Sequence, residues 1–278
     1  MLKKFSVTGF KNFKNTITMD FSDVRDYRFH PECITDGLIS TAIIYGKNAV
    51  GKTNFGLALF DIVSHLTMNS ATEGLYDYYL NEKTDWASFE YVFQFGNDEI
   101  VYRYKKFNTQ DLEAEYLELN SEELFSVEPY SHGYKTNFSG IERIVPTLNW
   151  DNQEIGVGKS YLKFCLYNSS IEKSHPLIKM KHFVNNMVLF RALSDNYVGE
   201  YIGVGKKSDY FDFIFNHIEE FNKLLKIAEI NKTVRGIKDP DGFVRLYFDA
   251  ASPMPFFKVA SSGTRALYNF FYWRVLQN

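Results

Sequence analysis

Cysteine is scarce in this chain of 278 residues, which contains two, Cys33 and Cys165. They stand 132 positions apart (165 − 33), and neither belongs to a Cys-x-x-Cys pair. Closely spaced cysteines are typical of disulfide frameworks and zinc sites, so the sequence indicates neither. We interpret both residues as ordinary thiols.

Long apolar runs are missing as well. No run reaches the roughly 18 to 20 residues that a membrane-spanning helix needs. The first residues, 1–7, lack the apolar core and the small-residue cleavage site of a signal peptide. The sequence therefore predicts no membrane partner, and a cytoplasmic location follows by default.

The chain has no excess of basic residues. It carries 31 Lys and Arg against 34 Asp and Glu, for a formal net charge of −3. Dedicated nucleic-acid-binding domains present a basic surface, so the charge does not support nucleic acid as a partner, although a local patch remains compatible with it. Aromatic residues are plentiful by contrast, at 17%, and we interpret most of them as core and sheet filling.

Hydrophobic patterning in the first third predicts a hairpin, a buried strand and a helix. Alternating side chains at 4–10 and 15–21 indicate the hairpin. The apolar, β-branched run at 38–45 is typical of a strand buried on both faces, and we expect it to be central in its sheet. Apolar residues then recur at helical spacing from Thr53 onward.

Further along, residues 86–126 read as an antiparallel subsheet and residues from about 171 to 230 as helical. The clearest helical segments are 180–193 and 211–227, and a strand is expected at 243–248 after a turn. The predicted fold class is α/β. The predicted domains are a first lobe at 1–170, a mostly helical insertion at 171–235, and return strands at 236–278.

A phosphate-binding motif lies between the predicted strand at 38–45 and the predicted helix. It matches the pattern GxxxxGK[ST] in full and consists of Gly46, Lys47, Asn48, Ala49, Val50, Gly51, Lys52 and Thr53. In such a P-loop, or Walker A motif, backbone N–H groups converge on phosphate oxygens and the following helix adds its positive end. We expect Lys52 to contact the β and γ phosphates of ATP and the Thr53 hydroxyl to ligate Mg²⁺.

A second string, Gly156 to Ser160, imitates the end of this motif. Its first glycine position is Gln153, and no buried strand precedes it. We interpret this string as a surface loop rather than a second phosphate site.

Small hydroxyl residues and a glycine stand near the end, at Ser261, Ser262, Gly263 and Thr264, just before a helical run. Such a step can donate N–H and hydroxyl groups to an anion. In isolation a plain helix N-cap at Ser261 or Ser262 is the favoured interpretation.

Taken together, these features resemble the ABC-type ATPases of the RecF/SMC and OLD-like group, especially bacterial AAA-type ATP-binding proteins of phage-defence and restriction-linked gene clusters. Four segments carry the resemblance: the opening at 7–14, the P-loop followed by Asn54, the strands around 102–104 and 115–117, and residues 261–264.

The resemblance implies a P-loop ABC-type ATPase head with an antiparallel β subsheet and a mostly helical insertion. Residues 1–170 are then the ATP-binding lobe, and residues 236–278 hold the return strands and the signature motif. The resemblance also implies that Ser261, Ser262 and Gly263 form an ABC signature, which meets the γ-phosphate of ATP held by the other subunit. The implied assembly is a homodimer with ATP and Mg²⁺ sandwiched between subunits, coupled to an effector protein. An antiphage role is implied only because the genes of such relatives occur in phage-defence gene clusters.

One departure from the family pattern concerns catalysis. Relatives carry, after the signature, an apolar strand ending in Asp-Glu that supports Mg²⁺ and activates water. Asn278 is only 14 residues after Thr264 (278 − 264), so we assign no catalytic residue and expect a chain truncated before this Walker B segment, with little ATP turnover. The glutamine loop is not placed either, and Gln94 is interpreted as a strand residue.

Two alternatives remain. The chain is an ATPase acting as a switch, or it is a nucleotide-binding regulatory or scaffold protein that does not hydrolyse ATP. A P-loop kinase or GTPase is disfavoured because no Asn-Lys-x-Asp guanine motif is present.

Overall fold

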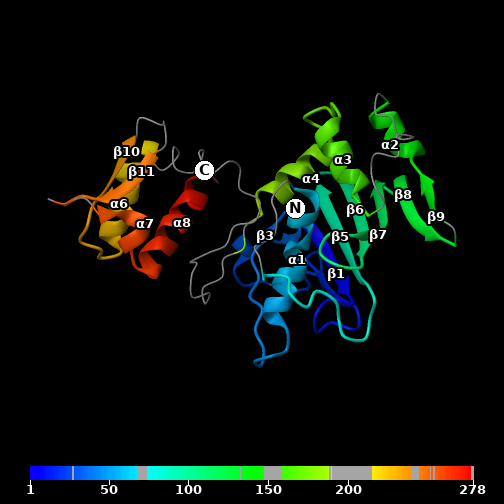
Figure 1. Ribbon diagram of the computed structural model, residues 1–278, viewed down its shortest axis with the longest axis horizontal. Helices are drawn as coiled ribbons and strands as arrows, with labels where there is room; N and C mark the ends of the chain where they lie inside the picture. The colour runs from blue at the N-terminus through cyan, green and yellow to red at the C-terminus, as the bar shows by residue number, and fades with distance from the viewer. Residues whose placement is uncertain are drawn as a thin grey trace. The chain divides into compact units, whose positions relative to one another are not determined.

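The computed structural model describes residues 1–26, 28–67, 74–131, 133–146, 158–187, 189, 215–238, 244–250, 252 and 254–276 (Figure 1). The chain divides into two compact units, Met1–Met187 and Val188–Asn278. Within the described residues, no helix is long and apolar enough to cross a membrane.

The first unit is built on a seven-stranded antiparallel sheet with the strand order β2-β1-β5-β6-β7-β8-β9. Its strands are β1 (Leu2–Thr8), β2 (Ile17–Asp20), β5 (Ala87–Phe95), β6 (Asp98–Lys106), β7 (Leu112–Leu119), β8 (Glu122–Tyr130) and β9 (Gly133–Asn137). The predicted hairpin and subsheet are both confirmed. The sheet is larger than expected because β1 pairs with β5, and β8 and β9 extend it past residue 126.

Helices cover one face of this sheet (Figure 1). The longest is α1 (Lys52–Leu66), which confirms the helix expected after the P-loop. It is held against the sheet by the Tyr91 hydroxyl, which donates to the carbonyl of Ala58 at 3.0 Å, and by an edge contact between the Phe5 and Phe55 rings. The shorter helices are α2 (Ser139–Ile144), α3 (Tyr161–Asn168) and α4 (Pro176–Asn185).

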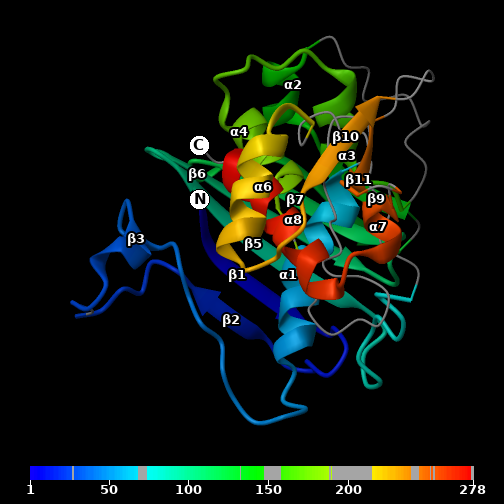
Figure 2. The ribbon, with the colours of Figure 1, turned by 90° about the vertical axis from the view of Figure 1, so that its left-hand side faces the viewer.

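The buried central strand predicted at 38–45 is wrong. Only Leu38–Ile39 (β4) is a strand, and it pairs with the equally short β3 (Ile34–Thr35) after a single 3₁₀ turn at Pro31–Cys33. Residues 40–46 have no regular structure and are all exposed. Figure 2 shows this stretch of the chain running from the β3–β4 hairpin to the beginning of α1. The β-branched composition gives strand propensity, but a strand also needs partners for its backbone groups. The N–H groups of Ser40 and Thr41 donate to the carbonyl of Cys33, at 2.8 and 3.4 Å, and no ladder of strand pairing continues beyond them in the described residues.

The helical prediction for 171–230 is confirmed at two helices, α4 and α6 (Ile218–Ile227), in the part of this range that the structure describes. Helix α4 ends at Asn185, whereas the predicted segment continued to residue 193, most of which lies outside the described residues. The segment predicted at 211–227 corresponds in part to α6, and residues 211–214 lie outside the description.

The second unit has a three-stranded sheet of β10 (Val234–Lys238), β11 (Val244–Phe248) and β12 (Met254–Pro255). Strand β11 confirms the expectation at 243–248. Helices α6, α7 (Phe256–Val259) and α8 (Ser262–Leu276) pack with this sheet around a buried aromatic group that includes Phe221, Phe256 and Tyr268.

Candidate functional site

The P-loop closes on its own lysine. Lys52 is the first residue of α1, and its Nζ donates to the carbonyls of Gly46 and Lys47, at 2.8 Å each. Ala49 and Gly51 have positive φ angles of 63° and 103°, which curl the chain between them. A glycine suits the second position because it has no Cβ to clash. The result is a compact, exposed loop with an ammonium group at its centre.

The N-terminus of α1 is open to an anion. Gly51 is the N-cap and offers no side-chain cap, and the first turn holds no acidic residue. The first N–H groups of a helix have no intrahelical acceptor and carry the positive end of the helix dipole. These groups, with Lys52 beside them, are chemically suited to hold a phosphate. Thr53 is exposed one position further on.

A turn from the β1–β2 hairpin braces the loop. The Asn12 side chain donates to the carbonyl of Val50 at 3.3 Å and accepts from the Asn54 amide at 2.8 Å. A Cβ at Gly51 would lie 2.5 Å from Asn12 Nδ2 and 2.9 Å from the Phe13 ring. No role was expected for Asn12 from the sequence, because its contact with Val50 spans 38 positions and its place in a short turn between two strands is only a weak signal.

A buried ionic group fixes the middle of α1 to the sheet. Asp61 accepts from Lys106 Nζ and from the hydroxyls of Tyr79 and Tyr104, each at 2.8 Å. Burial, and then the nearby Asp61 charge, raise the pKa of both tyrosines well above the ordinary value, so they stay protonated and donate.

A second buried network of hydrogen bonds links the end of α1 to α3. The Tyr102 hydroxyl donates to Glu115 at 2.6 Å and lies 2.6 Å from His65 Nε2. Burial, followed by the charges of Lys106 and Lys163, holds the pKa of His65 well below its usual range. Because the Tyr102 hydroxyl donates its proton to Glu115, it can accept a hydrogen bond from His65. A neutral His65 with its proton on Nε2 supplies that donor.

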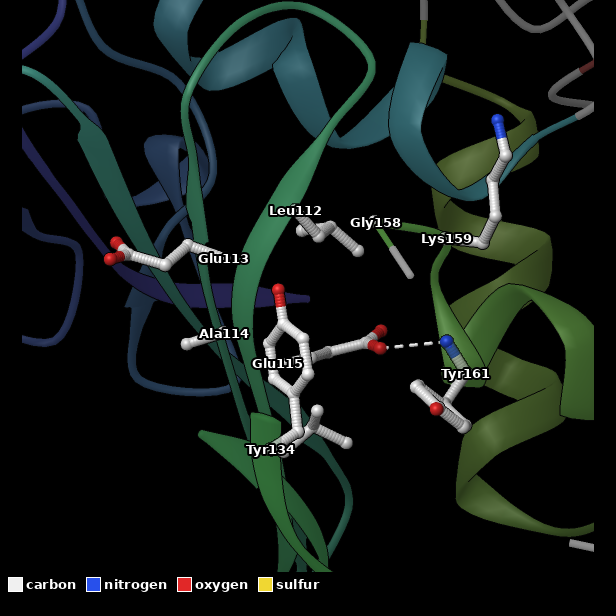
Figure 3. A pocket seen from close by; sticks show the side chains of 9 residues that line it. Leu112, Glu113, Ala114, Glu115, Tyr134, Gly158, Lys159 and Tyr161 are labelled. Carbon is white, nitrogen blue, oxygen red and sulfur yellow. Dashed lines mark hydrogen bonds between the residues drawn. The ribbon is translucent and has the colours of Figure 1, made fainter. Parts of the chain in front are cut away.

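The second glycine-lysine-serine string ends at α3, and it is not simply a surface loop. Lys159 is exposed, and Figure 3 shows it pointing away from the pocket, but Ser160 is buried and is the N-cap of α3. Glu115 accepts from Ser160 Oγ and from the Tyr161 backbone N–H, both at 2.7 Å. Figure 3 shows the second of these hydrogen bonds. A carboxylate of the chain itself therefore occupies the position that an anion would take at this helix end.

Burial raises the pKa of Glu115, while the hydrogen bonds from Tyr102, Ser160 and the helix N–H groups oppose that rise. The two helices therefore differ at their N-termini: Glu115 occupies the N-terminus of α3, whereas α1 has no side-chain cap.

The predicted signature residues lie in the second unit. Ser261 accepts from the Thr264 N–H at 3.2 Å and lies 2.9 Å from the Thr264 hydroxyl, so it caps α8. Ser262 and Gly263 are exposed in the first turn of that helix. The structure thus brings residues 46–54 together at one site, and it places residues 261–263 on a different unit.

Gln94 is a strand residue, as interpreted from the sequence. It lies in β5, and its side chain donates to the carbonyls of Gly96 and Asp98 at 2.8 and 3.2 Å in the hairpin turn. The two cysteines are free thiols, and burial raises the pKa of Cys165 to about 11.

The loop and the open helix on an α/β scaffold define a P-loop nucleotide-binding protein. Residues 42–275 match the family described as "AAA domain, putative AbiEii toxin, Type IV TA system". The chain belongs to this family.

Solved structures show a distant likeness. The SMC head domain from Thermotoga maritima is 16% identical, over 99% of this chain and 72% of that chain, with a TM-score of 0.34. The recombination mediator protein RecF, solved as RecF-ATP, is 13% identical, over 98% of this chain and 79% of that chain, with a TM-score of 0.38. No curated protein matches the chain.

Proposed function

We propose that this chain binds ATP and Mg²⁺ at residues 46–54 and acts as a nucleotide-dependent dimeric switch of the ABC type. The observation that carries the proposal is the N-terminus of α1, which has no side-chain cap and no acid in its first turn, beside the ammonium of Lys52. A triphosphate fits this combination, because backbone N–H groups and one cation can share its oxygens.

In this proposal each part of the loop has its own role in binding the nucleotide. The backbone of residues 46–51 surrounds the β-phosphate, Lys52 exchanges its two carbonyl partners for the β and γ phosphates, and the Thr53 hydroxyl ligates Mg²⁺. Asn54 and Asn12 hold the loop in place from the side.

The test is Lys52→Ala, measured by calorimetry with Mg²⁺ and a non-hydrolysable ATP analogue. Loss of charge-assisted hydrogen bonds should weaken binding by roughly 10- to 100-fold. The fold should persist, since the lysine bonds only to exposed loop carbonyls. Lys135→Ala, on the exposed edge strand β9, is the matched control. Unchanged affinity for Lys52→Ala would contradict the assignment, and Thr53→Ala should reduce the dependence on Mg²⁺.

Steady ATP turnover that disappears with Lys52→Ala would separate a hydrolysing switch from the alternative, a nucleotide-binding regulatory or scaffold protein. An antiphage role with an effector partner is a further part of the proposal. It is supported by the family description, which names a putative toxin of a toxin–antitoxin system. Phage plating on cells that express the natural chain or Lys52→Ala tests it.

A further inference from the structure

An open pocket of about 830 Å³ lies beside the P-loop in the first unit. It is lined on one side by Asn12 and by Asn54 of the first turn of α1, and on the other by the segment 77–82. Because Asn12 also donates to the Val50 carbonyl, the pocket opens directly next to the phosphate site.

The far wall of the pocket is fixed relative to the loop. The N–H of Lys11 donates to the carbonyl of Tyr79 at 3.0 Å, and its Nζ donates to the carbonyl of Asp77 at 2.5 Å. Asn81 closes the contact by donating to the carbonyls of Gly9 and Lys11, at 2.8 and 2.6 Å. The segment 77–81 is therefore tied to the same turn that braces the P-loop.

Tyr78 is the aromatic side chain of this wall. It is 93% exposed, whereas its neighbours Tyr76 and Tyr79 are each 6% exposed. Its φ is +53°, a left-handed conformation that is uncommon for a bulky residue. Such conformations cost free energy and persist where the surrounding structure imposes them, often at ligand sites. The backbone thus presents an aromatic ring to the pocket instead of burying it.

We infer that this pocket holds the nucleoside half of the nucleotide, with the ring of Tyr78 stacking on the base. The inference rests on the proposed function. A nucleoside triphosphate needs, beyond its phosphates, a flat apolar surface for the base and polar groups for the ribose hydroxyls. Tyr78 supplies the first, and the carboxylate of Asp77 and the amide of Asn54 line the same pocket.

The test compares two ligands that share the phosphate chain. Mg²⁺ with a non-hydrolysable ATP analogue engages both halves of the site, and Mg²⁺ with inorganic tripolyphosphate engages only the P-loop. Stacking of a base on an aromatic ring is worth enough that Tyr78→Ala should weaken binding of the ATP analogue about tenfold. Tripolyphosphate affinity should stay unchanged, and Tyr78→Phe should bind both ligands like the natural chain.

Phe29→Ala is the matched control, because this ring is 77% exposed and lies outside the pocket. Thermal unfolding of each variant reports whether the fold is intact. The inference is overturned if Tyr78→Ala binds the ATP analogue like the natural chain, or loses both ligands equally. If the natural chain binds neither ligand, the proposed function fails together with it, a result distinct from loss confined to Tyr78→Ala.

Discussion

Asp61 and Lys106 form an ion pair whose side chains are each 1% exposed, a costly place for two charges. Removing charges from water costs several kcal/mol for each ion, so such a pair persists only when its remaining hydrogen-bonding capacity is used. Here the hydroxyls of Tyr79 and Tyr104 complete the carboxylate. The pair also joins α1, which begins at the P-loop, to strand β6.

Removing one partner should cost far more than removing both. Asp61→Ala leaves the Lys106 charge buried without its partner, and we expect a loss of about 3–5 kcal/mol in the free energy of unfolding. Asp61→Leu combined with Lys106→Met should recover most of that loss, since apolar side chains of similar volume can replace a buried pair. Urea denaturation measures both variants.

The control is an exposed pair on the same unit. Arg143 and Glu122 are 66% and 57% exposed, and Glu122→Ala should cost less than about 1 kcal/mol. A double variant at Asp61 and Lys106 that is no more stable than Asp61→Ala would show that the ion pair itself is not the source of the loss.

Two glycines differ at the scale of elements, although both lie in helices. In α1, a Cβ at Gly56 would meet nothing within 4 Å. In α2, a Cβ at Gly140 would lie 2.4 Å from the carbonyl oxygen of Glu123 on β8. The first glycine therefore only weakens its helix, whereas the second allows α2 to approach the sheet.

The same substitution should then have opposite effects. Gly56→Ala should stabilise the protein by about 0.5–1 kcal/mol, the difference in helix propensity. Gly140→Ala should destabilise it by about 1–3 kcal/mol, because α2 must move away from β8. Thermal unfolding of the two variants checks this, and stabilisation by Gly140→Ala would mean that α2 does not pack on β8 as described.

Elements set by local periodicity could be predicted from the sequence, and those set by distant partners could not. Helix α1 and strands β5 to β7 follow from their own residues, as does the P-loop at 46–53. The strand expected at 38–45 failed because its pairing depends on other parts of the chain. Glu115 caps α3 through Tyr161, which is 46 positions away in the sequence, so no local pattern predicts this contact.

At the scale of the whole molecule, the two halves of the proposed nucleotide site lie on different units. Lys52 belongs to the first unit, and Ser262 and Gly263 belong to the second. A ligand shifts an equilibrium only if it makes different contacts in the two states. In our proposal the closed dimer supplies that difference, because the signature of one subunit meets the γ-phosphate bound by the other.

Gly263 is the position where this proposal can be tested with little risk to the fold. It is exposed, and a Cβ there would lie 4.0 Å from Ser261 Oγ, its nearest neighbour, so a side chain fits. Gly263→Glu should leave ATP binding by each subunit unchanged and abolish dimerisation induced by ATP, because its carboxylate would repel the partner's γ-phosphate. Gly263→Ala keeps the charge unaltered and should still dimerise. Sedimentation with and without a non-hydrolysable ATP analogue measures both, and an analogue-bound natural chain that stays monomeric, or a Gly263→Glu variant that dimerises normally, would show that this helix end does not act across subunits.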